Sequence, residues 1–211
     1  MSELSKQFEI AVATTLAPAL ADLGFKRTRM HFRRVRGEIV DVISLVRSKH
    51  GDGCMVFLGM HLTFLPLEVV GDARQMFNIE RLYAYSCAFQ APLLTQFSRC
   101  QVWSYRGIFR TPTMTTRAIL REYLRSGERL FKRFNYVKDF TELATVQSIE
   151  YSPKNKFFGW LGGPGACLKF ARVHAHIGEF SEAREYANLG LRMLGHAAFL
   201  EEPLREIAKE T

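Results

Sequence analysis

The chain lacks the features of a secreted or membrane-inserted protein. Its first residues hold neither a basic region nor an apolar signal segment. The most apolar stretch, Cys54 to Val70, is too short to span a bilayer and is interrupted by His61, Pro66 and Glu68. The four cysteines form no C-x-x-C pair. These absences predict a cytoplasmic protein without membrane insertion, whose cysteines are reduced and buried.

Catalytic and metal-binding motifs are absent as well. The sequence contains no G-x-S-x-G, no H-E-x-x-H and no nucleotide P-loop. His174 and His176 are two residues apart, so on a helix they diverge and cannot chelate one ion together. We therefore expect a protein that is not an enzyme and that uses no metal and no cofactor.

One pair of residues keeps an enzymatic alternative open. Asp41 lies between Val40 and Val42, and His61 lies in a neighbouring apolar stretch. Paired across adjacent strands, they could perform the acid–base chemistry of a hydrolase. If Asp41 is instead simply buried, it needs a cation such as Arg34 or Arg47.

Apolar periodicity predicts an α+β fold. Leu4, Phe8, Val12, Leu16 and Leu20 follow helical spacing up to a stop at Gly24, with a kink or break at Pro18. Three strand-like stretches follow at 31–36, 38–48 and 55–64, separated by short glycine turns. They predict an antiparallel meander, and the second stretch is apolar on both faces, so we expect both faces of the sheet to be covered.

Further helices complete the predicted organisation. Thr113 or Thr115 can cap a helix that carries several arginines, and three short helices are expected at 166–177, 181–194 and 198–208. The predicted division is a core domain at 1–150, a Gly/Pro-rich linker at 151–165 and a helical hairpin at 166–211 docked on the core.

Two segments resemble known families. The runs Leu20-Ala-Asp-Leu-Gly-Phe-Lys-Arg, Phe32-Arg-Arg and Ile43-Ser-Leu-Val-Arg-Ser-Lys resemble a bacterial domain-of-unknown-function family, number 4304. Val46 departs from that pattern, where a glutamine is expected, and Phe131 to Leu143 is similar to the family's C-terminal helices. The likeness spans roughly the first two thirds of the chain and implies an α+β fold with no established activity. Gly178-Glu-Phe-Ser-Glu-Ala183, with Gly190 beyond it, resembles part of one tetratricopeptide repeat, a single helical hairpin.

The clearest functional signal is a ridge of arginines at every fourth residue: Arg117, Arg121, Arg125, Arg129 and Arg133. Like charges at this spacing repel by roughly 0.2–0.5 kcal/mol per pair. Glu122 and Glu128 are spaced to compensate its centre, which would make the ridge an ordinary solvated face. Otherwise an acidic partner compensates it, and the ends of the ridge contribute most.

A second basic cluster comprises Lys26, Arg27, Arg29, Arg33, Arg34 and Arg36. It either protects an exposed sheet edge or binds a partner together with the ridge. With a net charge of +8, the chain is expected to bind an acidic protein, with an immunity-type neutraliser of a toxin or effector as the sharpest version. Nucleic-acid binding is the alternative. Gly162, Gly163 and Gly165 precede a predicted helix and form a weaker candidate for holding an anion, or an interdomain turn.

Overall fold

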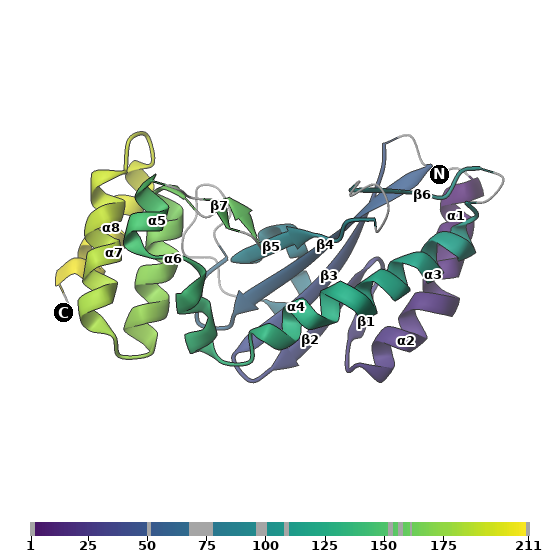
Figure 1. Cartoon of the computed structure of the whole chain (residues 1–211), viewed down its shortest axis with the longest axis horizontal. Coiled ribbons are helices and arrows are strands. Elements are labelled where there is room, and N and C mark those ends of the chain that lie inside the picture. Colours follow the sequence, from purple (N-terminus) through teal and green to yellow (C-terminus); the bar gives the residue numbers. More distant parts are fainter. Residues whose placement is uncertain are drawn as a thin grey trace. The chain divides into compact units, whose positions relative to one another are not determined.

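The computed structural model describes residues 3–49, 52–67, 78–95, 101–107, 110–151, 154–155, 158–160 and 162–209. The chain divides into two compact units (Figure 1), of which the first holds Met1–His61 and Asn78–Arg133 and the second holds Leu62–Phe77 and Phe134–Thr211. The units therefore divide after Arg133, and not at the predicted position 150. Among the described residues, no helix is long and apolar enough to cross a membrane.

The chain opens with the predicted amphipathic helix, which contains a π-helical segment. The order is α1 (Glu3–Ala11), η1 (Val12–Leu16) and α2 (Ala17–Asp22), with Pro18 in the first turn of α2. In a regular α-helix the proline ring clashes with the carbonyl four residues earlier. The wider π turn directly before Pro18 accommodates that ring, so the predicted kink takes this form.

An antiparallel sheet forms the centre of the first unit, in the order β1-β2-β3-β4-β5 with β6 also paired to β4. The strands are β1 (Lys26–Thr28), β2 (His31–Arg36), β3 (Ile39–Arg47), β4 (Gly53–Leu62), β5 (Phe89–Pro92) and β6 (Val102–Ser104). Periodicity predicted the three longest strands, whereas β1 and β5 were missed because they have only three and four residues.

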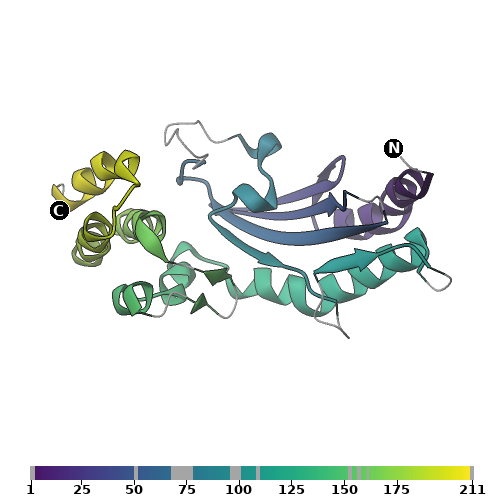
Figure 2. The ribbon, with the colours of Figure 1, turned by 90° about the horizontal axis from the view of Figure 1, so that it is seen from above.

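Both faces of this sheet are covered, as the apolar pattern of β3 predicted. Figure 2 shows the sheet between the α3–α4 helix and the segment that carries η2 (Ile79–Arg81) and η3 (Ala84–Ser86). The β2–β3 register places Phe32 opposite Ile43 and Arg34 opposite Asp41, on the face that α3–α4 covers. Neighbouring residues alternate between faces, so every residue from Ile39 to Leu45 is buried.

The arginine-bearing helix runs through α3 (Pro112–Glu122), the π-helical segment η4 (Tyr123–Gly127) and α4 (Glu128–Arg133). Its N-cap is Thr111, whose hydroxyl accepts from the Met114 amide at 3.3 Å, so the predicted capping by Thr113 or Thr115 is wrong. Pro112 occupies the first turn, where its missing N–H costs nothing. A Cβ on Gly127 would lie only 2.6 Å from the Tyr123 ring and 3.2 Å from Leu58, so glycine allows the helix to approach β4.

The second unit is mainly helical. It contains η5 (Val137–Leu143), α5 (Val146–Tyr151), the short pair β7 (Lys154–Asn155) and β8 (Gly159–Trp160), α6 (Gly163–His176), α7 (Phe180–Arg192), η6 (Ala198–Leu200) and α8 (Glu201–Lys209). The predicted C-terminal helical hairpin is confirmed by α6 and α7, which turn at Gly178.

Small residues bring the helices of this unit together. Ala183 is fully buried, and a Cβ on Gly190 would lie 2.8 Å from Leu204 and 2.9 Å from Cys167. The Tyr186 hydroxyl donates to the Ala144 carbonyl at 2.6 Å. The hairpin therefore packs through the small side chains that the repeat-like pattern indicated.

Candidate functional site

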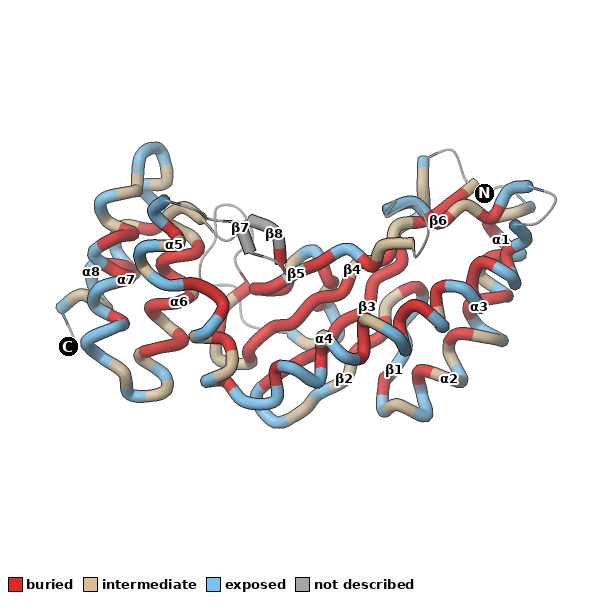
Figure 3. Tube along the Cα trace, in the orientation of Figure 1, coloured by how far each residue is buried: buried red, intermediate tan, exposed pale blue. Residues whose placement is uncertain are grey.

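All five arginines of the ridge are exposed to solvent, as the helical pattern predicted. Figure 3 shows exposed and buried residues alternating along α3 and α4, because one side of this helix packs on the sheet. On the packed side, Ile119, Tyr123 and Phe131 are at most 1% exposed. The helix is thus held by its apolar side and presents its arginines outward.

The centre of the ridge lies in the π-helical segment. Successive positions four residues apart drift by about 40° around a regular α-helix. A π turn holds more residues than an α turn, so the drift along the ridge is interrupted at η4, which contains Arg125.

The two glutamates of this helix compensate the ridge unequally. Glu122 accepts two hydrogen bonds from Arg125, at 3.0 and 2.8 Å, and these bonds raise the pKa of Arg125. Glu128 instead turns inward, and its oxygens accept from Arg34 of β2. The expectation that both glutamates neutralise the centre of the ridge is therefore wrong for Glu128. On its own helix Glu128 has an ion pair with Lys132, at a distance of 3.9 Å.

Two exposed apolar residues lie beside the first two arginines of the ridge. Met114 is 50% exposed and Leu124 is 49% exposed. Together with Arg117 and Arg121 they follow a three-four-three spacing, which places them along one side of the helix. Among the described residues, no carboxylate forms an ion pair with Arg117 or Arg121. We call Met114, Arg117, Arg121 and Leu124 the α3 stripe.

The second basic cluster does not form one surface. Lys26, Arg27 and Arg29 are exposed at the edge strand β1 and its turn, which fits edge protection. Arg33 is only 5% exposed, and its Nε donates to the Leu82 carbonyl at 2.7 Å. Arg34 points to the opposite face of the sheet. The prediction that Arg33 and Arg34 bind a partner is wrong, because both guanidiniums are engaged inside the unit.

Arg34 belongs to a buried ionic network that joins β2, β3 and α4. Asp41 is fully buried, and its Oδ2 accepts from Arg34 at 2.9 Å and from Arg36 at 2.7 Å. Arg34 also donates to both Glu128 oxygens at 3.1 Å, and Tyr123 donates its hydroxyl hydrogen to Glu128. We call these five residues the Asp41 network.

In this network, burial and neighbouring charges shift the pKa of Arg34 in opposite directions. Burial alone would lower the pKa of Arg34, but hydrogen bonds to Glu128 and the charge of Asp41 outweigh it and raise that pKa. Burial, with Glu128 close by, raises the pKa of Tyr123. All the carboxylate oxygens of Asp41 and Glu128 accept hydrogen bonds, so the network anchors the helix to the sheet and offers no free acid or base. The predicted Asp41–Arg34 pair is confirmed, whereas Arg47 pairs with Glu9.

The acid–base pair of Asp41 and His61 is not formed. Asp41 faces α4, whereas the Nδ1 of His61 accepts from the Ala88 amide at 3.1 Å on the other side of the sheet. Gly59, two residues before His61, likewise faces Ala84 and Cys87. The pair is therefore separated by the sheet itself.

His31 is partly buried on the same side of the sheet as His61. The Nδ1 of His31 lies 2.9 Å from the Ser44 hydroxyl, and Ser44 also accepts from the Ala84 amide. Burial, and then the charge of Arg33, lowers the pKa of His31 to about 4. His31 is consequently neutral near pH 7.

This shift predicts a loss of stability on mild acidification. The unfolded chain takes up the proton near pH 6.5 and the folded chain only near pH 4, so the stabilisation is complete above pH 6.5 and is lost as the pH falls toward 4. Between pH 7.5 and pH 5, the wild type should lose about 1 kcal/mol more unfolding free energy than His31→Gln, after allowance for the partial exposure of His31. Urea unfolding at both pH values measures this difference. His196→Gln, at an exposed histidine, should follow the wild type, and parallel curves for His31→Gln would contradict the prediction.

The remaining candidates contribute little. Gly162 is the N-cap of α6, and Gly163 has φ +81° in the first turn; anion binding there stays a prediction. Cys54, Cys87 and Cys167 are buried free thiols, as expected, and Cys100 lies outside the described residues. Burial raises the pKa of Cys54 to about 12 and that of Cys167 to about 11. Within the described ranges, no three His, Cys, Asp or Glu side chains form a group that could hold a metal.

Comparison with known families gives a match over part of the chain. Residues 16–108 match the model of a family described as "Domain of unknown function (DUF4304)". The resemblance seen in the sequence is confirmed over this range, and the match ends before the ridge and before Phe131 to Leu143. No curated protein and no solved structure matches the chain.

Proposed function

We propose that the protein is a non-enzymatic binding protein that engages an acidic protein partner through the α3 stripe. The observation that carries this proposal is the combination of two arginines without an ion-pair partner among the described residues and two half-exposed apolar side chains on one side of a helix. Protein interfaces combine buried apolar anchors with arginines that bind carboxylates bidentately.

The surroundings of the stripe support this role. Pro112–Arg133 extends about 33 Å at 1.5 Å per residue, long enough to support an interface of ordinary size. The Asp41 network and the close contact at Gly127 hold the other side of the helix to the sheet. A helix that is already fixed loses little conformational entropy when a partner binds.

The sharpest form of the proposal is an immunity-type protein that neutralises a toxin or effector. A protein that binds one acidic partner tightly needs no chemistry of its own. Nucleic-acid binding is the competing possibility, because arginines also bind phosphates and the net charge is +8. Met114 and Leu124 favour a protein, since exposed aliphatic side chains gain nothing from a phosphate backbone.

Charge reversal of the stripe tests the proposal. The partner is captured from the producing cells after nuclease treatment, purified, and titrated against the wild type and Arg117→Glu/Arg121→Glu. We expect the double variant to bind about 100-fold more weakly, because the two introduced glutamates would then face the like charges of an acidic partner. In cells that express the partner, the wild type should relieve toxicity and the double variant should not.

The matched control is Arg184→Glu/Lys209→Glu, which makes the same change of charge at two exposed positions of the second unit. It should bind within twofold of the wild type, and a thermal melt checks that each variant is folded. Equal binding by the stripe variant and the wild type would contradict the proposal. Binding that vanishes after nuclease treatment and falls steeply with salt would favour nucleic acid.

A further inference from the structure

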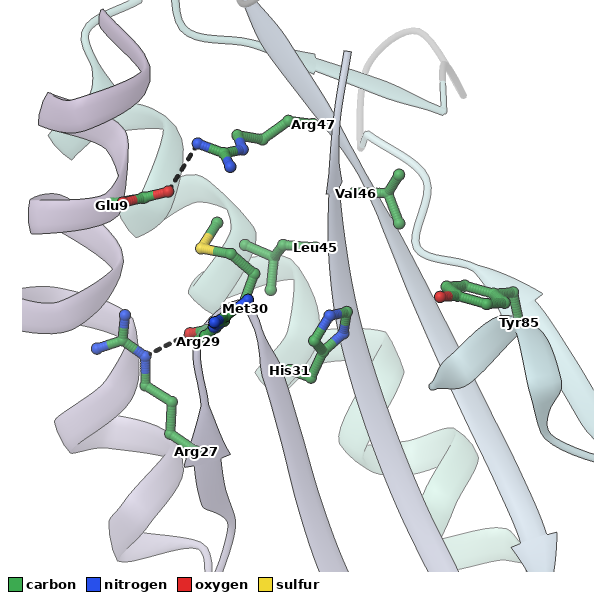
Figure 4. A pocket seen from close by; sticks show the side chains of 9 residues that line it. All are labelled: Glu9, Arg27, Arg29, Met30, His31, Leu45, Val46, Arg47 and Tyr85. Atoms are coloured by element: carbon green, nitrogen blue, oxygen red, sulfur yellow. Dashed lines mark hydrogen bonds and ion pairs between the residues drawn. The ribbon is translucent and has the colours of Figure 1, made fainter. Parts of the chain in front are cut away.

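A cavity of about 650 Å³ opens in the first unit, away from the ridge residues. Its lining comes from α1, from the β1–β2 turn, from the end of β3 and from the segment before β5 (Figure 4). Ligand sites for small molecules commonly have volumes of about 300–1,000 Å³. The cavity is therefore large enough for a small organic molecule.

Positive charge predominates around this cavity. Arg27, Arg29 and Arg47 line it with a single carboxylate, that of Glu9, which holds Arg47 at 2.6 Å. The Nε of Arg27 donates to the Arg29 carbonyl at 2.7 Å, so this guanidinium is held at the turn. Two guanidiniums thus remain without a carboxylate among the residues that line the cavity.

Arg29 has a backbone conformation that is costly for its residue type. Its φ is +55°, and it is the only non-glycine residue with positive φ among the described residues. Arg29 is the first of two loop residues between Thr28 and His31, a position that favours glycine when φ is positive. A strained residue beside a cavity suggests that its side chain, rather than its backbone, accounts for its presence.

The rest of the lining is apolar or aromatic. Met30 is 8% exposed and Leu45 is 2% exposed, so together they provide a buried apolar wall. Tyr85 is 54% exposed and stacks on Tyr83 with a centroid distance of 5.2 Å. Tyr85 lies across β3 from Arg27 and Leu45 (Figure 4), so Met30 and Leu45 form the apolar side nearest the free guanidiniums.

We propose that this cavity is a second binding site, which takes a small organic anion with an aromatic or apolar body. Its phosphate or carboxylate would accept from Arg27 and Arg29, and its body would pack on Met30 and Leu45. Arginine matches both anions through paired N–H donors, so the chemistry shared by the two is what the site recognises. This site is independent of the proposed partner surface.

Calorimetric titration with phenyl phosphate and with benzoate tests the proposal. We expect saturable binding of at least one of the two, at least about tenfold tighter than binding of inorganic phosphate or of benzyl alcohol, because each of these lacks half of the recognised chemistry. The preference between the two aromatic anions identifies the anionic group. Absence of saturable binding for both, or equal binding of inorganic phosphate, would overturn the proposal.

Substitutions at the turn give the second test. Arg27→Gln and Arg29→Gln should each weaken the tighter aromatic anion about tenfold or more. Arg29→Gly should weaken it as much without lowering the melting temperature, because glycine adopts positive φ without strain. Arg121→Gln, in the α3 stripe, should bind the anion like the wild type, which separates this proposal from the proposed function. Unchanged affinity in both Arg27→Gln and Arg29→Gln would refute it.

Discussion

Asp41→Asn is expected to lower the free energy of unfolding by about 3–5 kcal/mol, the range for removing one member of a buried ion pair. Asp41 is 0% exposed and receives hydrogen bonds from two guanidiniums. An amide of the same shape presents one oxygen and one NH2 group, so Arg36 loses one of its two bonds to this side chain and a donor then faces a cation. Two neighbouring positive charges would also lose the nearest negative charge.

Urea unfolding followed by intrinsic fluorescence measures this loss. Asp22→Asn provides the control, because Asp22 is exposed at the end of α2 and its substitution should change stability by less than about 0.5 kcal/mol. A loss below about 1 kcal/mol for Asp41→Asn would show that the Asp41 network does not anchor the helix to the sheet.

Gly59→Ala is expected to destabilise the first unit by about 3 kcal/mol, at the upper end of the cost of overpacking a core. A Cβ at this position would lie 2.6 Å from the Cys87 sulfur, 2.8 Å from the Ala84 Cα and 2.9 Å from the Ala84 carbonyl oxygen. Two of these atoms belong to the backbone, so a rotamer change cannot relieve the contact. Strand β4 or the segment around η3 would have to shift.

Gly165→Ala is the matched control for this substitution. Gly165 lies in the first turn of α6, and a Cβ there meets nothing within 4 Å. Alanine should therefore be neutral or stabilise the second unit by up to about 1 kcal/mol. If Gly59→Ala unfolds at the same urea concentration as the wild type, the close packing of η3 on β4 is not as the structure describes it.

Local patterns predicted most of the fold. The long strands, the arginine-bearing helix and the C-terminal hairpin follow from apolar spacing and from glycine stops, which are properties of adjacent residues. The N-cap was misplaced because three threonines lie within five residues of Thr111 and spacing alone does not show which hydroxyl is the cap. Strands β1 and β5 were missed because three or four residues show no clear period.

The candidate site was predictable only in part. Exposure of the ridge follows from its place opposite the apolar side of the helix. The direction of the Glu128 side chain does not follow from the sequence. Glu128 is three residues from Arg125, as Glu122 is, so helical spacing predicts the same pairing for both, whereas the structure pairs Glu128 with Arg34, 94 residues away in sequence. The exposed Met114 and Leu124 could have been found from their spacing with Arg117 and Arg121, since all four lie on one side of a helix.

The sequence by itself determined the elements, their order and the excess of positive charge, because these depend on composition and on residues close in the chain. Only the tertiary structure decided which charges are available to a partner. Alternation along β2 places Arg33 and Arg34 on opposite faces of the sheet. Only the packing shows that Arg33 donates to the Leu82 carbonyl and that Arg34 donates to Asp41 and Glu128. The cavity at Arg29 likewise forms where four segments distant in sequence meet, and no spacing within any one of them encodes that meeting.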